Sequence, residues 1–325
     1  MNKYIYYLKE FGSDEARDSF QAQIESIFDK NGFKPLVYPR ANYFRRFFYL
    51  ASLYFSIPRS SVIFFIHPLY AKTNRIILKW LGRKGCNTVC IVSDINSLRF
   101  KEQSTDEEIA YLKSIKFFIY QNKRMKEFVQ AKIGEKVSVY IEMFDLLFSI
   151  KETERKNTNQ VVFAGNTSKC PFIHELHQIE AVQWRIYSDT AIKEYPNLVS
   201  VVYSSGYDQP LSGSYGLIWE GESVLDISNF SGQYLKWVSP LKLSNYLLHS
   251  LPVIIHKDAA MADFVIENKI GYSISSLSEI PGKIKAISDN EYQTMVENTR
   301  KFSEKISTGH FTQKAIQAIL NKIRD

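Results

Sequence analysis

The chain has 325 residues, 45% of them hydrophobic, and carries 41 lysines and arginines against 34 aspartates and glutamates, which gives a formal net charge of +7 and a sequence pI of about 9.0. At about 150 residues per domain, this length predicts two domains with sizeable cores. The positive charge suits nucleic acid, an anionic membrane or a phosphorylated ligand, but no zinc-finger, basic-zipper or ribonucleoprotein pattern is present, which argues against a nucleic-acid-binding module.

The first half alternates short apolar runs with helical patterns. Ser13 stands where a helix would begin, with apolar positions at Phe20, Ile24 and Ile27. Strands are expected at 4–8, 35–38, 61–66, 88–92, 117–120 and 137–141, and helices at 72–81, 107–114 and 122–132. Alternation of this length predicts a parallel, doubly wound sheet.

The polar segment 151–160 has no apolar periodicity and reads as a linker, after which the alternation restarts. We therefore predict domains at 1–150 and 151–325. Strands are expected at 161–164, 184–187, 198–203, 215–219, 253–256 and 272–274, and helices beginning at Pro240, over 259–268 and over most of 289–324.

The helix predicted to begin at Pro240 has the composition of an anion site. Lys236 precedes it, and its first turn holds Lys242 and Ser244. A helix start has unpaired backbone N–H groups and the positive end of the dipole, so a diphosphate can bind there. Proline fits the first helical position because no N–H is lost. The competing interpretation is that the lysines are solvated surface charges and that Pro240 only marks an ordinary helix start.

A second candidate segment follows the strand 161–164. Gly165 lets the backbone approach a ligand closely, Asn166 comes next, and Lys169 is suited to contact phosphate. An ordinary strand-to-helix turn is the competing explanation.

Several long motifs carry a family resemblance. They are VVFAGNTSKCPFI (161–173), GLIWEGES (216–223), GQYLKWVSPLKLSNYL (232–247), LPVI (251–254) and AMADFVIENKIGYSISSLSE (260–279). They resemble bacterial GT-B glycosyltransferases, namely the β-1,6-galactofuranosyltransferases of O-antigen assembly and the glucosyltransferases that extend GlcNAc on serine-rich-repeat adhesins. The resemblance implies two Rossmann-like domains with an interdomain cleft, and a terminal helix that returns to the first domain.

The resemblance also implies which residues bind a UDP-sugar. Tyr203 is a candidate for stacking on uracil and Glu220 or Glu222 for the ribose hydroxyls, whereas Ser13 resembles the small polar residue that touches the donor phosphate. The alternatives are that Tyr203 is an aromatic side chain in the packing between domains, that the two glutamates are solvated loop residues, and that Ser13 only caps its own helix. The full donor-binding set is Ser13, Gly165, Asn166, Lys169, Tyr203, Glu220, Glu222, Lys236, Ser239, Pro240, Lys242, Leu243 and Ser244.

Catalysis in this class needs a stabilised leaving diphosphate and a base for the acceptor hydroxyl. Asp94 is the predicted base, although family members tend to read His-Asp where this chain reads Ser93-Asp94. A helix-capping role is the alternative for Asp94. No Asp-x-Asp occurs, and His174 with His177 lacks a third ligand at a convincing spacing, so we expect no metal. The products of the family that the chain resembles imply an inverting reaction.

The segment 42–59 interleaves aromatic side chains with Arg45, Arg46 and Arg59. This pattern is typical of a helix that lies on an anionic membrane, of a core helix with a basic edge, or of a contact between copies of the chain. An odd count of three cysteines without close paired spacing, and the lack of an apolar run of about 18 residues, favour a cytoplasmic protein, with peripheral membrane contact as a hypothesis.

The predicted function is therefore transfer of a hexose, with galactofuranose favoured, from a UDP-sugar to a glycan acceptor, in the lipid-linked form that segment 42–59 would suit. No separate cofactor is expected. Glucosyl transfer to a GlcNAc-modified glycoprotein is the alternative within the family. A sugar-nucleotide-binding partner subunit without catalytic activity is the alternative from another class.

Overall fold

The structure is a computed structural model that describes residues 4–9, 20–37, 43–101, 104–151, 153–202 and 207–324. It divides into two compact units, one of Met1–Glu142 with Phe311–Asp325 and one of Met143–His310. The chain therefore passes between the units twice, at 142/143 and at 310/311, and the first passage comes before the polar segment 151–160 that the sequence indicates as a linker. Within the described residues, no helix is long and apolar enough to cross a membrane.

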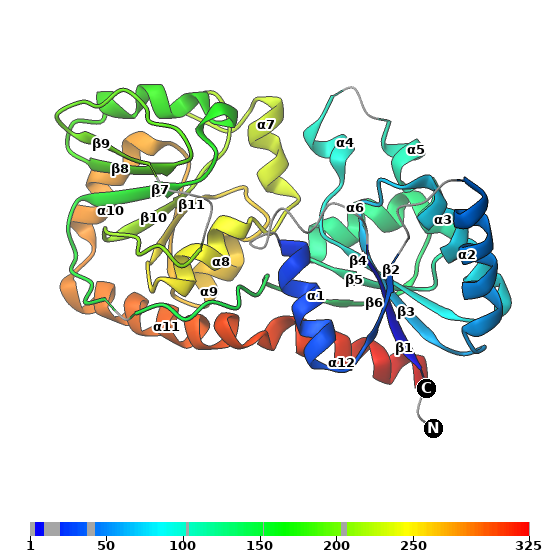
Figure 1. Cartoon of the computed structure of the whole chain (residues 1–325). Helices are drawn as coiled ribbons and strands as arrows, with labels where there is room; N and C mark the ends of the chain where they lie inside the picture. The colour runs from blue at the N-terminus through cyan, green and yellow to red at the C-terminus, as the bar shows by residue number, and fades with distance from the viewer. Residues whose placement is uncertain are drawn as a thin grey trace. The chain divides into compact units, whose positions relative to one another are not determined.

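The first unit is built on a six-stranded parallel sheet in the order β2-β1-β3-β4-β5-β6 (Figure 1). The strands are β1 (Ile5–Lys9), β2 (Lys34–Val37), β3 (Val62–His67), β4 (Asn87–Val92), β5 (Phe117–Tyr120) and β6 (Val137–Tyr140). Every residue of β3 is buried, as expected of a central parallel strand whose first five residues are apolar.

Helices complete this unit, most of them in the connections between strands, and the last of them comes from the C-terminal end of the chain. They are α1 (Phe20–Lys30), α2 (Tyr43–Ser56), α3 (Lys72–Lys84), α4 (Asn96–Arg99), α5 (Thr105–Ile109), η2 (Ala110–Ser114), α6 (Lys123–Ile133) and α12 (His310–Arg324). The helix predicted over 107–114 is thus an α-helix followed by a 3₁₀ helix. Ser104 begins it, with a side chain that accepts from the Glu107 amide.

The second unit repeats the architecture with the strand order β12-β11-β10-β7-β8-β9. Its strands are β7 (Gln160–Ala164), β8 (Gln183–Ser188), β9 (Leu198–Val202), β10 (Tyr215–Ile218), β11 (Val253–His256) and β12 (Gly271–Ile274). All neighbouring strands are parallel, as the alternation predicts.

The helices of this unit are mostly short. They are η3 (Thr167–Lys169), η4 (Pro171–Gln178), α7 (Phe230–Gln233), η5 (Tyr234–Lys236), α8 (Leu241–Leu248), α9 (Ala262–Glu267), η6 (Leu277–Glu279), α10 (Ile280–Ala286) and α11 (Asp289–Thr308). The single helical region predicted over 289–324 is two helices, because Gly309 takes the left-handed conformation (φ 79°) and ends α11.

Candidate functional site

The sheet of the second unit changes direction between β7 and β10. The chain runs outward from β7 through β8 to β9, then returns to the other side of β7 with β10 and continues to β11 and β12. Ligands of open parallel sheets bind outside the carboxyl ends of the strands at such a switch point. Gly165 directly follows β7 at this place, and Glu220 lies two residues beyond the end of β10.

Tyr246 of α8 occupies the space where β7 and β10 part. The two strands pair at Gly216 and Val162, and beyond that pair the Tyr246 hydroxyl donates to the Leu217 carbonyl (3.0 Å) and accepts from the Ala164 amide (2.9 Å). A Cβ on Gly216 would lie 2.3 Å from the tyrosine ring, so only glycine leaves room for it. Tyr246 thereby ties α8 to both strands. Sequence reasoning missed Tyr246, although a glycine inside a strand signals such a close approach.

Lys242, in the first turn of α8, meets Glu220 at the switch point. Its ammonium forms an ion pair with Glu220 Oε1 and lies 5.0 Å from the centre of the Phe163 ring. The two charged side chains are 18% and 21% exposed, so both still reach solvent. A Cβ on Gly165 would stand 2.9 Å from Lys242 Cε, which shows that Gly165 gives the lysine its space.

The other oxygen of Glu220 accepts from the Cys170 thiol (3.3 Å). Glu222, the second predicted ribose ligand, is exposed. Between them Gly221 takes a positive φ of 121°, which favours glycine, and a Cβ there would lie 2.9 Å from Asn229 Oδ1. This turn therefore holds Glu220 against Lys242 and directs Glu222 to solvent.

The start of α8 differs by one residue from the prediction. Pro240 is the residue before the helix, with extended backbone (φ −70°, ψ 137°), and Leu241 is the first helical residue. The side chains of Ser239, Leu243 and Ser244 are buried, and Ser239 Oγ contacts Met261 Sδ at 3.1 Å. Any polar contact of Leu243 with a ligand would thus come from its backbone.

Lys236 lies in η5, close enough to His256 at the end of β11 to affect the pKa of the imidazole. His256 accepts a hydrogen bond at Nδ1 from the Asp258 amide (3.0 Å) and meets the edge of Trp219 at 5.2 Å between ring centres. Burial lowers the pKa of His256 from its ordinary value, and Lys236 is among the charges that lower it further. Burial therefore favours the neutral imidazole.

The turn after β7 is held by Asn166. Its Oδ1 accepts from the Ser168 amide (2.9 Å) and the Ser168 hydroxyl (2.5 Å), which begins η3. Ser13 and Tyr203, together with the side chain of Lys169, lie outside what the structure describes.

Asp94 lies in the first unit, two residues beyond the end of β4. Its Oδ1 accepts from the Ile95 amide (2.7 Å), and its Oδ2 lies 3.5 Å from Arg99 Nη1. The residue that begins α4 is Ile95, and no side-chain cap forms there. Asp94 therefore stands one residue before the position that begins the helix.

Glu108 secures the segment after Asp94 and was not predicted from the sequence. Its two oxygens accept from the Asn96 amide (2.7 Å) and the Ser97 amide (2.8 Å), and Oε1 lies 3.5 Å from the buried Nε2 of His67. Desolvation raises the pKa of Glu108, but the nearby His67 imidazole and the hydrogen bonds from the Ser97 and Asn96 amides together outweigh it and leave the pKa below its ordinary value. Nothing in the local sequence signals this contact between distant residues.

Metal ligands do not cluster in the part of the chain that the structure describes, where no group of three or more His, Cys, Asp or Glu side chains could hold an ion. His177 stacks on Tyr195 instead, with ring centres 4.0 Å apart.

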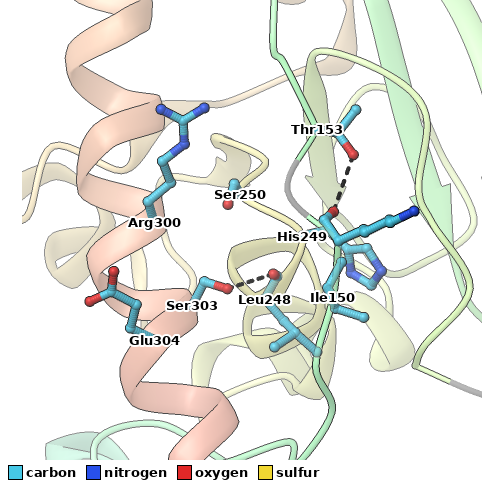
Figure 2. A pocket seen from close by; sticks show the side chains of 9 residues that line it. Ile150, Thr153, Leu248, His249, Ser250, Arg300, Ser303 and Glu304 are labelled. Atoms are coloured by element: carbon cyan, nitrogen blue, oxygen red, sulfur yellow. Dashed lines mark hydrogen bonds between the residues drawn. The ribbon is translucent and has the colours of Figure 1, made fainter.

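A cavity of about 190 Å³ lies at the opposite end of α8 from Lys242 (Figure 2). Its walls come from the segment after Ile150, from the turn that ends α8 and from α11, where Ser303 donates to the Leu248 carbonyl (2.7 Å). None of the predicted site residues lines it. It is lined by Ile150, Lys151, Thr153, Leu248, His249, Ser250, Arg300, Ser303 and Glu304.

Both halves of the chain match models of one family. Residues 2–143 match the glucosyltransferase 3-like N-terminal domain, and residues 161–319 match the glucosyltransferase 3-like C-terminal domain. The chain is 30% identical over 248 residues to the beta-1,6-galactofuranosyltransferase WbbI of Escherichia coli (strain K12), which covers 73% of this chain and 72% of that protein. It is 26% identical over 180 residues to glucosyltransferase 3 of Streptococcus gordonii, covering 54% of this chain and about half (52%) of that relative.

Solved structures with a similar fold bind uridine nucleotides. The Anabaena HepE protein in complex with UDP has a TM-score of 0.61 at 10% identity, covering 98% of this chain and 99% of that one. The pneumococcal O-GlcNAc transferase GtfA in complex with UDP and GlcNAc has a TM-score of 0.54 at 14% identity, covering 85% of this chain and 60% of that one. At these identities the likeness shows the shared fold of two Rossmann-like units.

Proposed function

Because this chain belongs to the glucosyltransferase 3-like family of GT-B glycosyltransferases, we propose that it transfers a hexose from a UDP-sugar to a glycan acceptor in cell-surface polysaccharide synthesis. The observation that carries this proposal is the meeting of Lys242, Glu220 and the start of α8 at the switch point of the second sheet. A cation beside a helix start suits a diphosphate, and a carboxylate beside it suits the hydroxyls of ribose.

Stabilisation of the leaving UDP is assigned to charges of the protein. Lys242, Lys236 and Lys169 would neutralise the diphosphate, and the amide groups at the start of α8 would donate to it. Since Lys242 already pairs with Glu220, it is held at the site before a ligand arrives. The proposed reaction needs no metal, and it inverts the anomeric carbon, with Asp94 taking the proton of the acceptor hydroxyl.

We favour galactofuranose as the transferred sugar and a lipid-linked glycan as its acceptor, acted on at the inner face of the membrane. The support is that the galactofuranosyltransferase relative matches a larger share of this chain, at higher identity, than the glucosyltransferase 3 relatives do. Glucosyl transfer to a glycoprotein is the second candidate, and those same relatives support it.

Calorimetry of the purified protein with UDP, UDP-glucose, UDP-galactose and UDP-galactofuranose tests the proposal. We expect UDP and one sugar nucleotide to bind, and Lys242→Ala to weaken binding by about 10- to 100-fold, since a hydrogen bond to a charged group contributes about 1.5–3 kcal/mol. Lys283→Ala, at an exposed position of α10, is the matched control. Absence of UDP binding, or equal binding by Lys242→Ala, would reject the site. Binding without turnover would instead identify a non-catalytic partner subunit.

A further inference from the structure

Helix α2 presents a stripe of phenylalanine side chains to solvent. Phe44, Phe48 and Phe55 are 73%, 68% and 80% exposed. Their spacings of four and seven residues place them on one face of the helix. Leu50 is buried, so the helix packs on the unit through a different side. Large apolar side chains gathered on one exposed face mark an interaction surface.

Helix α3 contacts α2 and exposes a stripe of a different kind. Lys72, Ile76, Lys79 and Arg83 recur at intervals of three or four residues, and all four are exposed. Three cations thus lie along the solvent face of α3, with one isoleucine among them.

The two helices also share an apolar groove of about 330 Å³. It is lined by Ala51, Tyr54 and Phe55 from α2 and by Trp80 and Arg83 from α3. Phe55 of the aromatic stripe and Arg83 of the basic stripe therefore lie on the same groove. In Figure 1 these helices are the blue and light-blue pair of the first unit. We name the exposed faces of α2 and α3, with this groove, the α2–α3 face.

This part of the chain has no acidic side chains. Between Asp29 and Asp94 the sequence holds eleven lysines and arginines and not one aspartate or glutamate, while the whole chain has a net charge of +7. The rest of the chain is therefore acidic on balance, and the positive charge is concentrated in the segment that forms α2 and α3. A surface of this sign attracts anions over about a Debye length, roughly 10 Å at 0.1 M salt.

We propose that the α2–α3 face docks this protein on a membrane of anionic phospholipid. The phenylalanines would enter the boundary between headgroups and acyl chains, and the cations of α3 would stay among the phosphate groups. The purpose of docking rests on the proposed function, since it would bring the enzyme to a lipid-linked acceptor. The docking itself is measured without any sugar donor.

The charge of the face distinguishes a membrane from a second copy of the chain. A symmetric contact between copies would bring the same basic stripe to one interface from both partners, and like charges there oppose association. The buried centres of protein interfaces are also poor in lysine. A bilayer surface supplies the missing negative charge and an apolar layer together.

Sedimentation of the full-length protein with vesicles tests this proposal. We expect binding to vesicles that contain phosphatidylglycerol, weaker binding to phosphatidylcholine alone, and release by high salt. Replacing Lys72, Lys79 and Arg83 with glutamine should weaken binding by about fivefold per cation, as expected for about 1 kcal/mol each near an anionic surface. The matched control replaces Lys283, Lys285 and Lys301, exposed lysines of the second unit, with glutamine, and we expect no change.

A second variant, Phe44→Ala with Phe48→Ala and Phe55→Ala, separates insertion from charge attraction. We expect it to weaken vesicle binding at least tenfold and to keep UDP affinity, which shows that the protein is folded. Equal binding of the wild type to neutral and anionic vesicles, or none to either, overturns the proposal. Loss of an oligomer in this variant, without vesicle binding by the wild type, would assign the face to contact between copies. Vesicle binding without UDP binding would keep the docking surface and reject the donor site.

Discussion

Lys242 and Glu220 form an ion pair that positions the lysine side chain and contributes little to the stability of the fold. Partly exposed pairs contribute only about 0–1 kcal/mol to stability, because water screens them. The pair instead holds the lysine over the Phe163 ring, above the position that Gly165 leaves free. An entering diphosphate would take the lysine from Glu220, and the carboxylate would then be available to accept from donor hydroxyls.

Asp94→Asn tests the proposed base. The amide retains the size of the side chain and an oxygen that accepts from the Ile95 amide, but it takes up no proton. We expect kcat to fall by about 10²- to 10⁴-fold with UDP affinity unchanged. Steady-state kinetics and calorimetry on one preparation measure both. Arg99→Gln removes the neighbouring positive charge and leaves the carboxylate in place, so a loss in that variant equal to the loss in Asp94→Asn would count against Asp94 as the base.

His256 predicts a dependence of stability on pH. Its folded-state pKa is lowered by burial, so below about pH 6.5 the unfolded chain binds a proton that the folded chain does not. The free energy of unfolding should therefore fall as the pH decreases below that value, by less than about 1.4 kcal/mol per pH unit for this one group. Protonation would also break the bond from the Asp258 amide.

Denaturant unfolding at about pH 7.5 and pH 5.5 measures this effect. His256→Asn supplies an oxygen that can accept from the Asp258 amide and does not titrate, so its stability should change less between the two pH values. An identical pH dependence in the wild type and the variant would show that other groups cause it.

At the scale of elements, α8 is the part that assembles the proposed donor site. Its first turn supplies Lys242 and its middle supplies Tyr246, which bonds to both β7 and β10. Tyr246 is fully buried, and the strands on either side pack around it. The backbone position of Lys242 is therefore fixed by the interior of the sheet, and the ion pair with Glu220 then orients its side chain.

Gly216→Ala tests this coupling. The new methyl group would overlap the Tyr246 ring, which is buried and has little room to move. We therefore expect the free energy of unfolding to fall by about 1–3 kcal/mol or more, and UDP to bind more weakly. Gly282→Ala in α10 meets nothing within 4 Å and should be neutral or stabilising by up to about 1 kcal/mol. Unchanged UDP affinity in a destabilised Gly216→Ala would separate Tyr246 from the site.

At the scale of the whole molecule, the chain folds into two units with one sheet each, and the last helix belongs to the first unit. Phe311, Ile316, Ile319 and Leu320 of α12 are buried. The C-terminal residues thus complete the core of a unit that otherwise ends at 142.

Ile319→Ala should destabilise the protein by about 2–5 kcal/mol, as a fully buried isoleucine truncated to alanine does. Because Ile319 belongs to the first unit and the proposed donor site to the second, UDP affinity at a temperature where the variant is folded should match the wild type. Lys322→Ala, exposed on the same helix, should change stability by less than about 0.5 kcal/mol. A loss of UDP affinity in Ile319→Ala would place part of the donor site outside the second unit.

Much of the architecture follows from local patterns. Short apolar runs such as 62–66 and 161–164 are typical of buried parallel strands, and their alternation with helical patterns predicts the two parallel sheets. Gly165, Glu220 and Lys242 could be selected from motif and resemblance. Helix ends were less predictable, as Pro240 and the break at Gly309 show, because capping depends on backbone angles that composition does not specify.

The sequence by itself therefore determined the fold class, the two halves and the family, and it supplied the chemical types of the proposed donor-site residues, because these depend on periodicity and on contiguous motifs. The tertiary structure decided which distant residues meet: Lys242 with Glu220 across the switch point, Tyr246 between two strands, Glu108 with His67, and the aromatic stripe of α2 beside the basic stripe of α3. Such contacts depend on strand order and on side-chain packing between elements far apart in the chain, which no local pattern records.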